Sequence, residues 1–218
     1  MILLAIDTAT ESCSAALWAD GKMYHRSSVQ PRLHAELILP FIDELLCEAK
    51  ITKSEIDGIV VGQGPGAFTG VRIGVAVTQG LALALNFPVV AVSNLQTLAF
   101  SAYQQLETSY PRIILVATDA RMSEVYWAKY QVRGKEIRQL TPETVSAASA
   151  VDLSGIDNFI GSGFSVYEEL KEHANNNPMP YQTNVFSQAK DMLLMVKNDF
   201  TKLAVDIDSV EPVYLREP

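Results

Sequence analysis

The sequence has few cysteines and no apolar run long enough to cross a membrane. Its two cysteines, Cys13 and Cys47, show no metal-binding or redox spacing, so we interpret both as small buried apolar residues. The most apolar segment, 73–85, is broken by Thr-Gln-Gly, whereas a membrane span needs about 18 uninterrupted apolar residues. The N-terminus lacks the basic region of a signal peptide. These absences predict a cytoplasmic protein without a membrane span.

Basic residues are also scarce. The chain has 17 lysines and arginines against 25 acidic residues, which gives a net charge of −8. Proteins that bind nucleic acids usually carry a basic patch, because neutralising phosphates supplies much of their affinity. No such cluster of lysines and arginines occurs in this sequence. We therefore expect another component to hold any RNA on which this protein acts.

The hydrophobic pattern predicts an α/β protein with two related halves, residues 1–107 and 108–218. The first half has a three-stranded meander followed by alternating helices and strands. Its expected strands are 2–9, 12–20, 21–28, 56–62 and 87–93, and its expected helices are 31–50, 67–86 and 94–105. The second half partly repeats this pattern. Its expected strands are 112–120, 124–132, 135–140 and 156–164, followed by a helix, a surface loop over 175–180 and a last helix over 187–200 that packs back on the first half.

Two helices of the first half are more apolar than one core contact requires. In the helix expected to begin at Pro31, Leu33 and Leu37 lie beyond an apolar stripe that is already wide. The stripe consists of Ala35, Ile38, Leu39, Phe41, Ile42, Leu45, Leu46 and Ala49. The next helix, 67–86, has Arg72 as its single charge. Together the two helices are expected to leave apolar surface for another protein chain.

The stretch VVGQGPGAFTGVRIG, residues 60–74, contains a glycine-rich loop between a strand and a helix. A phosphate-binding P-loop is excluded, because it needs a lysine after its last glycine and none occurs between Lys53 and Arg112. The dinucleotide-binding fingerprint fits the spacing of Gly62, Gly64 and Ala67. However, the next strand ends in Ser-Asn where that fingerprint expects an acidic residue.

Other features of this stretch favour a structural corner. Pro65 has no N–H to offer a phosphate. Gly70 and Gly74 lie four residues apart on one helix face, where glycine costs about 1 kcal/mol relative to alanine. That cost is understandable if another backbone segment passes close to them. We therefore interpret the loop mainly as the corner between the strand and a tightly packed helix.

Three stretches of the chain resemble the TsaB (YeaZ) family: LLAIDTATESCSAAL near the start, VGQGPGAFTGVRIG in the middle and EPVYLRE at the end. The resemblance spans the whole chain, and GPGAFTGVRIG is its most specific motif. It implies the actin-like fold of two α/β halves. It also implies a role in forming N6-threonylcarbamoyladenosine at position 37 of bacterial tRNA.

Members of this family are described as partners rather than catalysts. The resemblance implies pairing with the TsaD transferase, docking of the TsaE ATPase, self-association as a homodimer, and contact with tRNA only through the complex. The residues expected at the partner interface are Leu33, His34, Leu37, Phe41, Gly70, Arg72 and Gly74. We interpret His34 as a residue on the helix surface or in this interface.

A metal site of the transferase type is not expected. Where that enzyme has a pair of metal-binding histidines, our alignment places Asn94 and Leu98, which are poor substitutes for imidazole. The three histidines of the chain, His25, His34 and His173, are scattered. No cofactor is therefore required by this chain, although weak binding of ATP or ADP at a shared interface is compatible with the fold.

The nucleotide-binding turn is altered as well. Actin-like ATPases begin with Asp-x-Gly-x-Thr, whereas this chain has Ala9 in place of the glycine. Candidate residues near a nucleotide are Asp7, Thr8, Thr10, Gly64, Gly66, Gly161 and Gly163. The structural alternative is that Asp7 ends a strand and bonds the backbone of its own turn. An actin-like ATPase or small-molecule kinase thus remains the alternative function. A peptidase ranks last, because no nucleophile–base pair is evident.

Overall fold

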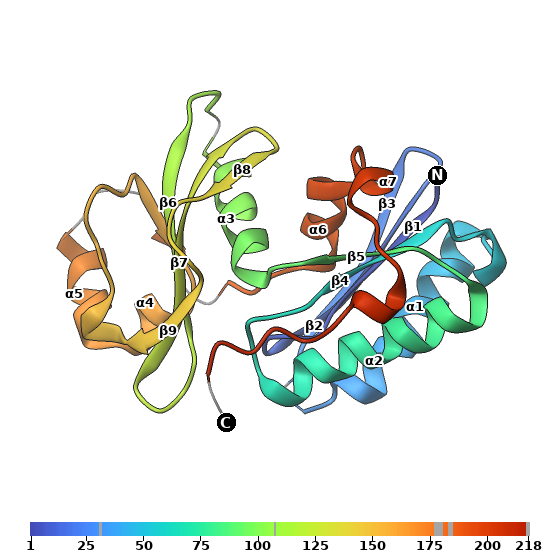
Figure 1. Cartoon of the computed structure of the whole chain (residues 1–218), viewed down its shortest axis with the longest axis horizontal. Coiled ribbons are helices and arrows are strands. Elements are labelled where there is room, and N and C mark those ends of the chain that lie inside the picture. The colour runs from blue at the N-terminus through green and yellow to red at the C-terminus, as the bar shows by residue number, and fades with distance from the viewer. Residues whose placement is uncertain (31, 107, 177–180, 183–184, 217–218) are drawn as a thin grey trace. The chain divides into compact units, whose positions relative to one another are not determined.

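The computed structural model describes residues 1–30, 32–106, 108–176, 181–182 and 185–216. The chain divides into two compact units (Figure 1). Unit 1 comprises Met1–Asn94 and Ser187–Val213, and unit 2 comprises Leu95–Phe186 and Tyr214–Pro218. This division differs from the expected halves 1–107 and 108–218, because residues 187–213 belong with the first unit and the chain enters the second at residue 95.

Unit 1 is built on a five-stranded sheet with the order β3-β2-β1-β4-β5. The first three strands form the expected antiparallel meander, and β4 and β5 then run parallel to β1. The strands are β1 (Leu3–Asp7), β2 (Ser12–Ala19), β3 (Lys22–Val29), β4 (Gly58–Gly62) and β5 (Val89–Val92). The helices that follow β3, β4 and β5 are α1 (His34–Ala49), α2 (Phe68–Leu85) and α3 (Asn94–Gln104).

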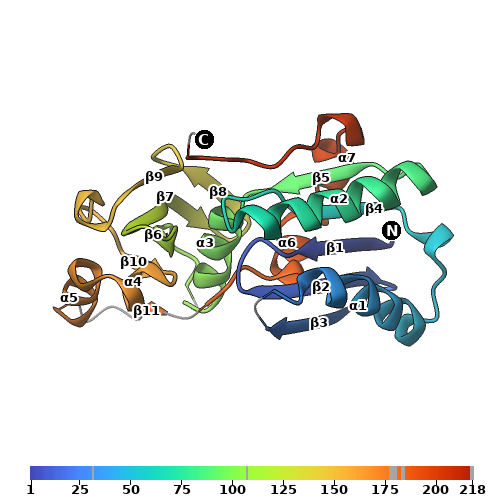
Figure 2. The same ribbon diagram turned by 90° about the horizontal axis from the view of Figure 1, so that it is seen from below.

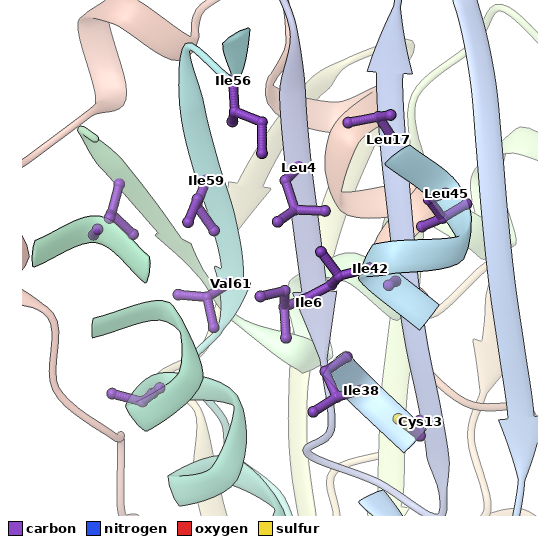
Figure 3. Packing of buried hydrophobic residues seen from close by; sticks show 14 of the residues in the cluster. Leu4, Ile6, Cys13, Leu17, Ile38, Ile42, Leu45, Ile56, Ile59 and Val61 are labelled. Carbon is purple, nitrogen blue, oxygen red and sulfur yellow. The ribbon is translucent and has the colours of Figure 1, made fainter. Parts of the chain in front are cut away.

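One face of this sheet is covered by α1 and α2. α1 lies over β2 and β3, and α2 lies over β4 and β1 (Figure 2). Because successive side chains of a strand point to opposite faces, Leu4 and Ile6 of β1 and Ile59 and Val61 of β4 point into this layer. They meet Ile38, Ile42 and Leu45 of α1 in a core that excludes water (Figure 3).

α1 begins at His34, later than expected, and Pro31 lies outside the described residues. Its buried apolar residues are Ile38, Ile42, Leu45 and Leu46, so the core uses only part of the predicted stripe. Leu39, on the predicted core face, is 49% exposed. The interpretation of Cys47 as a buried residue is wrong, because it lies on the outward side of α1, whereas Cys13 is buried as expected.

The other face of the sheet is covered by α6 (Ala189–Val196), which packs on β1, β2 and β4. The helix predicted over 187–200 is thus shorter, and α7 (Phe200–Leu203) follows it as a separate turn of helix. The ring of Phe200 leaves no room for a side chain on Gly58, because an added Cβ would lie 2.2 Å from its Cζ. Unit 1 therefore has three layers: two helices, a sheet, and the C-terminal helices.

Unit 2 repeats this plan. Five strands of its six-stranded sheet have the order β11-β10-β6-β7-β8, and the sixth strand, β9, pairs with β7. The strands are β6 (Arg112–Asp119), β7 (Glu124–Arg133), β8 (Glu136–Gln139), β9 (Thr144–Ala147), β10 (Asn158–Ile160) and β11 (Tyr181–Gln182). α3 packs on one face, while α4 (Gly163–Val166) and α5 (Glu168–Asn176) pack on the other. β9 was not expected, and residues 177–180 of the predicted surface loop lie outside the described residues.

The two units share one topology. In each, the first strand pairs antiparallel with the second and parallel with a later strand, which is β4 in unit 1 and β10 in unit 2. The positions of β3-β2-β1-β4-β5 correspond one by one to those of β8-β7-β6-β10-β11. The carboxyl ends of β1 and β6, and the glycine loops after β4 and β10, are therefore equivalent positions. Ligand sites of open α/β sheets commonly lie at such strand ends.

Candidate functional site

The carboxylate of Asp7 is the centre of the polar cluster at the end of β1. Its side chain is fully buried. Oδ1 accepts hydrogen bonds from the backbone N–H of Ala9 at 3.0 Å and from Nδ2 of Asn94 at 2.9 Å, and the Ser187 hydroxyl donates to Oδ2. The predicted bond from Asp7 to its own turn is thus present. Both carboxylate oxygens are already bonded by groups of the same unit.

Burial strongly affects the ionisation of this carboxyl. Removal from water raises the pKa of Asp7 from 3.8 to about 6, against the lowering effect of the bonds from Ser187, Ala9 and Asn94. Bonds donated to a carboxylate favour its charged form, so they offset part of the desolvation cost without abolishing it.

Asn94, at the start of α3, joins the Asp7 cluster to the glycine loop. Its Oδ1 accepts from the N–H of Gly64 at 2.8 Å, its own N–H donates to the Gly64 carbonyl at 2.9 Å, and its Nδ2 also donates to Ser187 Oγ at 2.6 Å. A Cβ on Gly62 would lie 2.8 Å from Asp7 Oδ1 and 3.0 Å from Asn94 Nδ2. Gly62 is therefore the residue that lets these two side chains meet.

The glycine loop itself is filled by the turn after β1. The N–H of Ala67 donates to the Ala9 carbonyl at 2.7 Å, and a Cβ on Gly66 would lie 2.2 Å from that same oxygen. Gly64 has a φ of +107°, and a Cβ there would lie 2.8 Å from the Val213 carbonyl. The loop is the packed corner predicted from the sequence, and its groups face its own chain rather than an open phosphate cradle.

Close contacts with Thr8 explain why Gly70 and Gly74 of α2 have no side chain. Its hydroxyl donates to the Gly70 carbonyl at 2.7 Å. A Cβ on Gly70 would lie 2.2 Å from the Thr8 carbonyl oxygen, and one on Gly74 would lie 2.7 Å from Thr8 Oγ1. The close backbone approach inferred from the sequence is therefore real, and it is made by this chain. Gly70 and Gly74 face inward in unit 1.

His34 is also internal. It is 7% exposed, and its Nε2 lies 2.8 Å from the carbonyl oxygen of Thr10. The interpretation of His34 as a residue of the helix surface is therefore wrong, because its ring ties α1 to the turn after β1. Of the other residues expected at the partner interface, Leu33, Leu37 and Phe41 are half-buried, and Arg72 is exposed above the ring of Phe68.

In unit 2 the equivalent strand end carries Asp119. Its Oδ1 accepts from the Tyr167 hydroxyl at 2.6 Å and from the N–H of Arg121 at 2.8 Å, and its own N–H donates to Ser162 Oγ at 2.9 Å. Gly161 and Gly163 follow β10 as predicted, and both pack against the Ala117 carbonyl. This second glycine loop is thus also closed by its own unit.

Sequence reasoning missed Ser187, Asp119 and Tyr167. Asp119 had a usable signal, because it ends the first strand of unit 2 as Asp7 ends that of unit 1. The positions expected to replace metal-binding histidines are occupied by Asn94, bonded as above, and by Leu98, which is 1% exposed in the core of unit 2. Among the described residues, no group of three His, Cys, Asp or Glu side chains is placed to hold a metal.

The helical layer of unit 1 leaves apolar side chains exposed. Leu39 of α1 is 49% exposed, and in α2 Phe68 is 57% and Leu83 69% exposed. In the part of the chain that the structure describes, α2 is the one helix long and apolar enough, by length and composition, to cross a membrane, and 33% of that window is buried. Helices inside folded domains can have the same composition. We call Leu39, Phe68 and Leu83 the exposed apolar set.

We predict that Gly62→Ala destabilises the protein by roughly 1–3 kcal/mol, because the new methyl group would push Asp7 and Asn94 apart. Gly80→Ala is the matched control. An added Cβ on Gly80 meets nothing within 4 Å, and alanine in a helix is favoured by about 1 kcal/mol. Urea unfolding should thus show opposite signs for the two variants. Equal stability of Gly62→Ala and wild type would contradict the packing described for Asp7.

A second prediction concerns pH. Because the pKa of Asp7 is higher in the folded state, its contribution to stability is present in full below pH 3.8 and is lost as pH rises through about 6. A rise from 3.8 to about 6 corresponds to about 3 kcal/mol. Asp7→Asn removes this titration. The free energy of unfolding of Asp7→Asn relative to wild type should therefore increase between pH 4 and pH 7, and a constant difference would refute the assignment.

Comparisons with known proteins agree with this architecture. Residues 27–207 match the family described as "TsaD: tRNA N6-adenosine threonylcarbamoyltransferase". The chain is 36% identical to the tRNA threonylcarbamoyladenosine biosynthesis protein TsaB of Escherichia coli, over 99% of this chain and 95% of the relative. The solved structure of YeaZ from Pseudomonas aeruginosa is similar with a TM-score of 0.85 and 38% identity, covering 98% of this chain and 99% of that chain.

A putative N-acetylmannosamine kinase from Listeria monocytogenes has a TM-score of 0.50 at 11% identity, covering 93% of this chain and 99% of that chain. That likeness concerns the fold alone. With the repeated strand order of the two units, it identifies the fold as actin-like, as predicted. The near full-length identity to TsaB and the match to YeaZ show that the chain belongs to the TsaB (YeaZ) family.

Proposed function

We propose that this chain is a non-catalytic subunit of the assembly that forms N6-threonylcarbamoyladenosine at position 37 of tRNA. In this proposal it acts in the cytoplasm, pairs with a TsaD-type transferase, activates it, and allows the TsaE ATPase to dock. The family of the chain, and the name of its relative as a biosynthesis protein, support the pathway. The pairing depends on one observation, the exposed apolar set of α1 and α2.

Large apolar side chains that are exposed to this extent favour burial against another protein. Leu39, Phe68 and Leu83 are each at least 49% exposed, and they come from two helices that contact each other. In the same two helices, Leu37, Phe41, Ile73, Val77 and Leu81 are only partly buried against the core. Several large apolar side chains exposed on one layer of a folded domain favour a protein–protein interface there. Burying it would release water at roughly 25 cal/mol per Å².

The occupant that we favour is the helical layer of the transferase, which is proposed from the family relationship. A second copy of this chain could use the same surface, since a two-fold interface brings one patch against itself. Homodimer and heterodimer would then compete. The net charge of −8 supports contact with tRNA through the complex rather than directly.

The pairing is tested with Leu39→Glu and Leu83→Glu. Each places a charge where the partner would exclude water, and burying an unpaired charge is costly, so complex formation should fall roughly 100-fold or more. Complex mass is measured by light scattering with the transferase, and modified tRNA is measured in the reconstituted system. Leu203→Glu is the control, because Leu203 in α7 is also a 49% exposed leucine of unit 1. Full modification without pairing would refute the proposal.

The non-catalytic part has its own test. Both oxygens of Asp7 are bonded within unit 1, and Gly64 and Gly66 are packed against backbone, so the isolated chain should not bind Mg-ATP with micromolar affinity. Isothermal titration of the chain alone measures this, and the titration is repeated with the transferase present to detect weak binding in a shared interface. Micromolar affinity with ATP turnover by the chain alone would favour the kinase or ATPase alternative.

A further inference from the structure

The turn between β6 and β7 has an unusual backbone. Three successive residues other than glycine, Arg121, Met122 and Ser123, have φ values of +62°, +56° and +62°. L-residues disfavour this left-handed region because Cβ approaches the following carbonyl oxygen, and they seldom enter it in runs. A segment of this kind persists only if its surroundings hold it.

The topology of the unit does not require this conformation. In unit 1 the equivalent connection, residues 8–11 between β1 and β2, has no residue with a positive φ. Nor does core packing explain it, since Met122 is 79% exposed and the side chain of Arg121 is 73% exposed. The forces that hold the turn must therefore come from polar contacts at its two ends.

The first end is held by local bonds. The N–H of Arg121 donates to Asp119 Oδ1 at 2.8 Å, and the guanidinium of Arg121 lies 3.0 Å from Asp119 Oδ2. The turn is closed by the N–H of Ala120 donating to the Glu124 carbonyl at 2.9 Å and by the N–H of Glu124 donating to the Arg121 carbonyl at 3.0 Å. These bonds define the turn but leave the Ala120 carbonyl and the Glu124 carboxylate to be satisfied.

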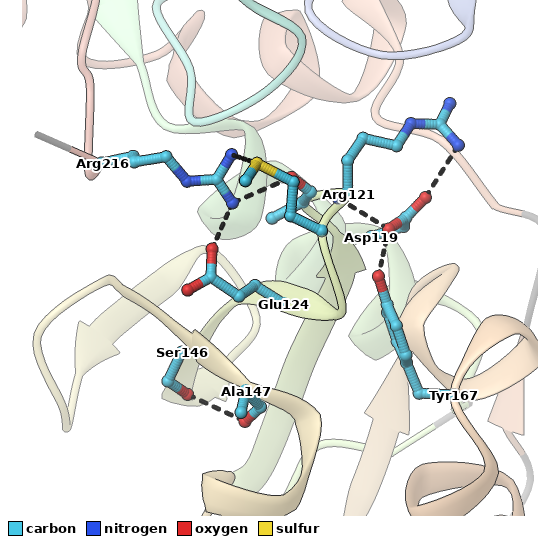
Figure 4. A network of polar contacts seen from close by, with 9 residues as sticks. Asp119, Arg121, Glu124, Ser146, Ala147, Tyr167 and Arg216 are labelled. Carbon is cyan, nitrogen blue, oxygen red and sulfur yellow. Dashed lines mark hydrogen bonds and ion pairs between the residues drawn. The ribbon is translucent and has the colours of Figure 1, made fainter. Parts of the chain in front are cut away.

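Arg216, near the end of the chain, satisfies both (Figure 4). One guanidinium nitrogen donates to the Ala120 carbonyl at 3.2 Å and pairs with the Glu124 carboxylate, and the other lies 3.4 Å from the sulfur of Met122. The planar fork of arginine can hold several acceptors in one fixed geometry, which lysine cannot do. The side chain of Arg216 thus contacts the residues before, within and after the left-handed run.

The segment that carries Arg216 is itself anchored. In unit 1, the Val210 carbonyl accepts from Gln79 Nε2 at 3.1 Å, and the N–H of Val213 donates to the Gln63 carbonyl at 2.8 Å. The chain then enters unit 2 at Tyr214. Arg216 thus belongs to the same unit as the turn that it contacts.

We propose that Arg216 is a positioning residue, a latch that holds the Arg121–Ser123 turn in its left-handed conformation. Without the latch the turn relaxes, and Arg121 and Met122 are presented differently on the surface of unit 2. The latch is independent of the proposed pairing through α1 and α2.

The test compares Arg216→Ala, Arg216→Lys and wild type by NMR and amide hydrogen exchange. A residue with positive φ gives a strong NOE between its own N–H and Hα, so this signal reports the turn directly. In Arg216→Ala the signal should be lost at residues 121–123, and exchange of the Ala120 and Glu124 amides should be about tenfold faster, because hydrogen bonds to charged groups are lost. Arg216→Lys should recover only part of this protection.

Two further variants complete the test. Arg112→Ala removes another arginine of unit 2, paired with Asp157 at 3.8 Å, and should leave the turn unchanged. Ser123→Gly should slow exchange at the turn in the wild-type background and should restore the signals in Arg216→Ala, because glycine accepts positive φ at little cost. The proposal is overturned if Arg216→Ala keeps the left-handed signals, if protection is lost equally throughout unit 2, or if Ser123→Gly has no effect.

Discussion

The buried carboxylate of Asp7 holds several distant segments of unit 1 at one point. It receives hydrogen bonds from the turn that follows β1, from Asn94 at the start of α3, and from Ser187 in the segment before α6. A carboxylate in such surroundings is costly unless its oxygens are bonded, so the three donors and the carboxylate depend on one another. The close fit of the glycine loop, with Gly62 against this cluster, follows from that constraint.

Both units carry a hydrogen-bonded aspartate at the end of the first strand, but the hydrogen-bond partners differ between the units. Each places an aspartate at the end of its first strand and a glycine loop after the parallel neighbour of that strand. In unit 1 the aspartate is fully buried and bonded by residues distant in the sequence. In unit 2 Asp119 is bonded by Tyr167 and by the turn that follows it. An aspartate therefore lies at the equivalent strand end in both units, with different hydrogen-bond partners in each.

The fold could be predicted where it depends on local patterns. The apolar run of β4 and the glycine corner before α2 were visible in the sequence, because strand and helix periods and glycine positions are local signals. The polar cluster could not be derived, since Ser187 lies 180 residues from Asp7. His34 was misassigned because its position on the helix does not reveal that the Thr10 carbonyl lies beside it. Burial of polar residues depends on such partners, and a single sequence does not show them.

The apolar composition of α2 also has a consequence for the amount of protein that a cell can keep in solution. Phe68 is 57% exposed and Leu83 is 69% exposed, so this helix can associate with other exposed apolar segments. Copies made in excess of whatever shields this helix would associate with one another or be recognised by chaperones and proteases. Under the pairing proposed above, production of this chain would have to keep pace with that of the transferase, and the exposed helix would set a stoichiometric limit.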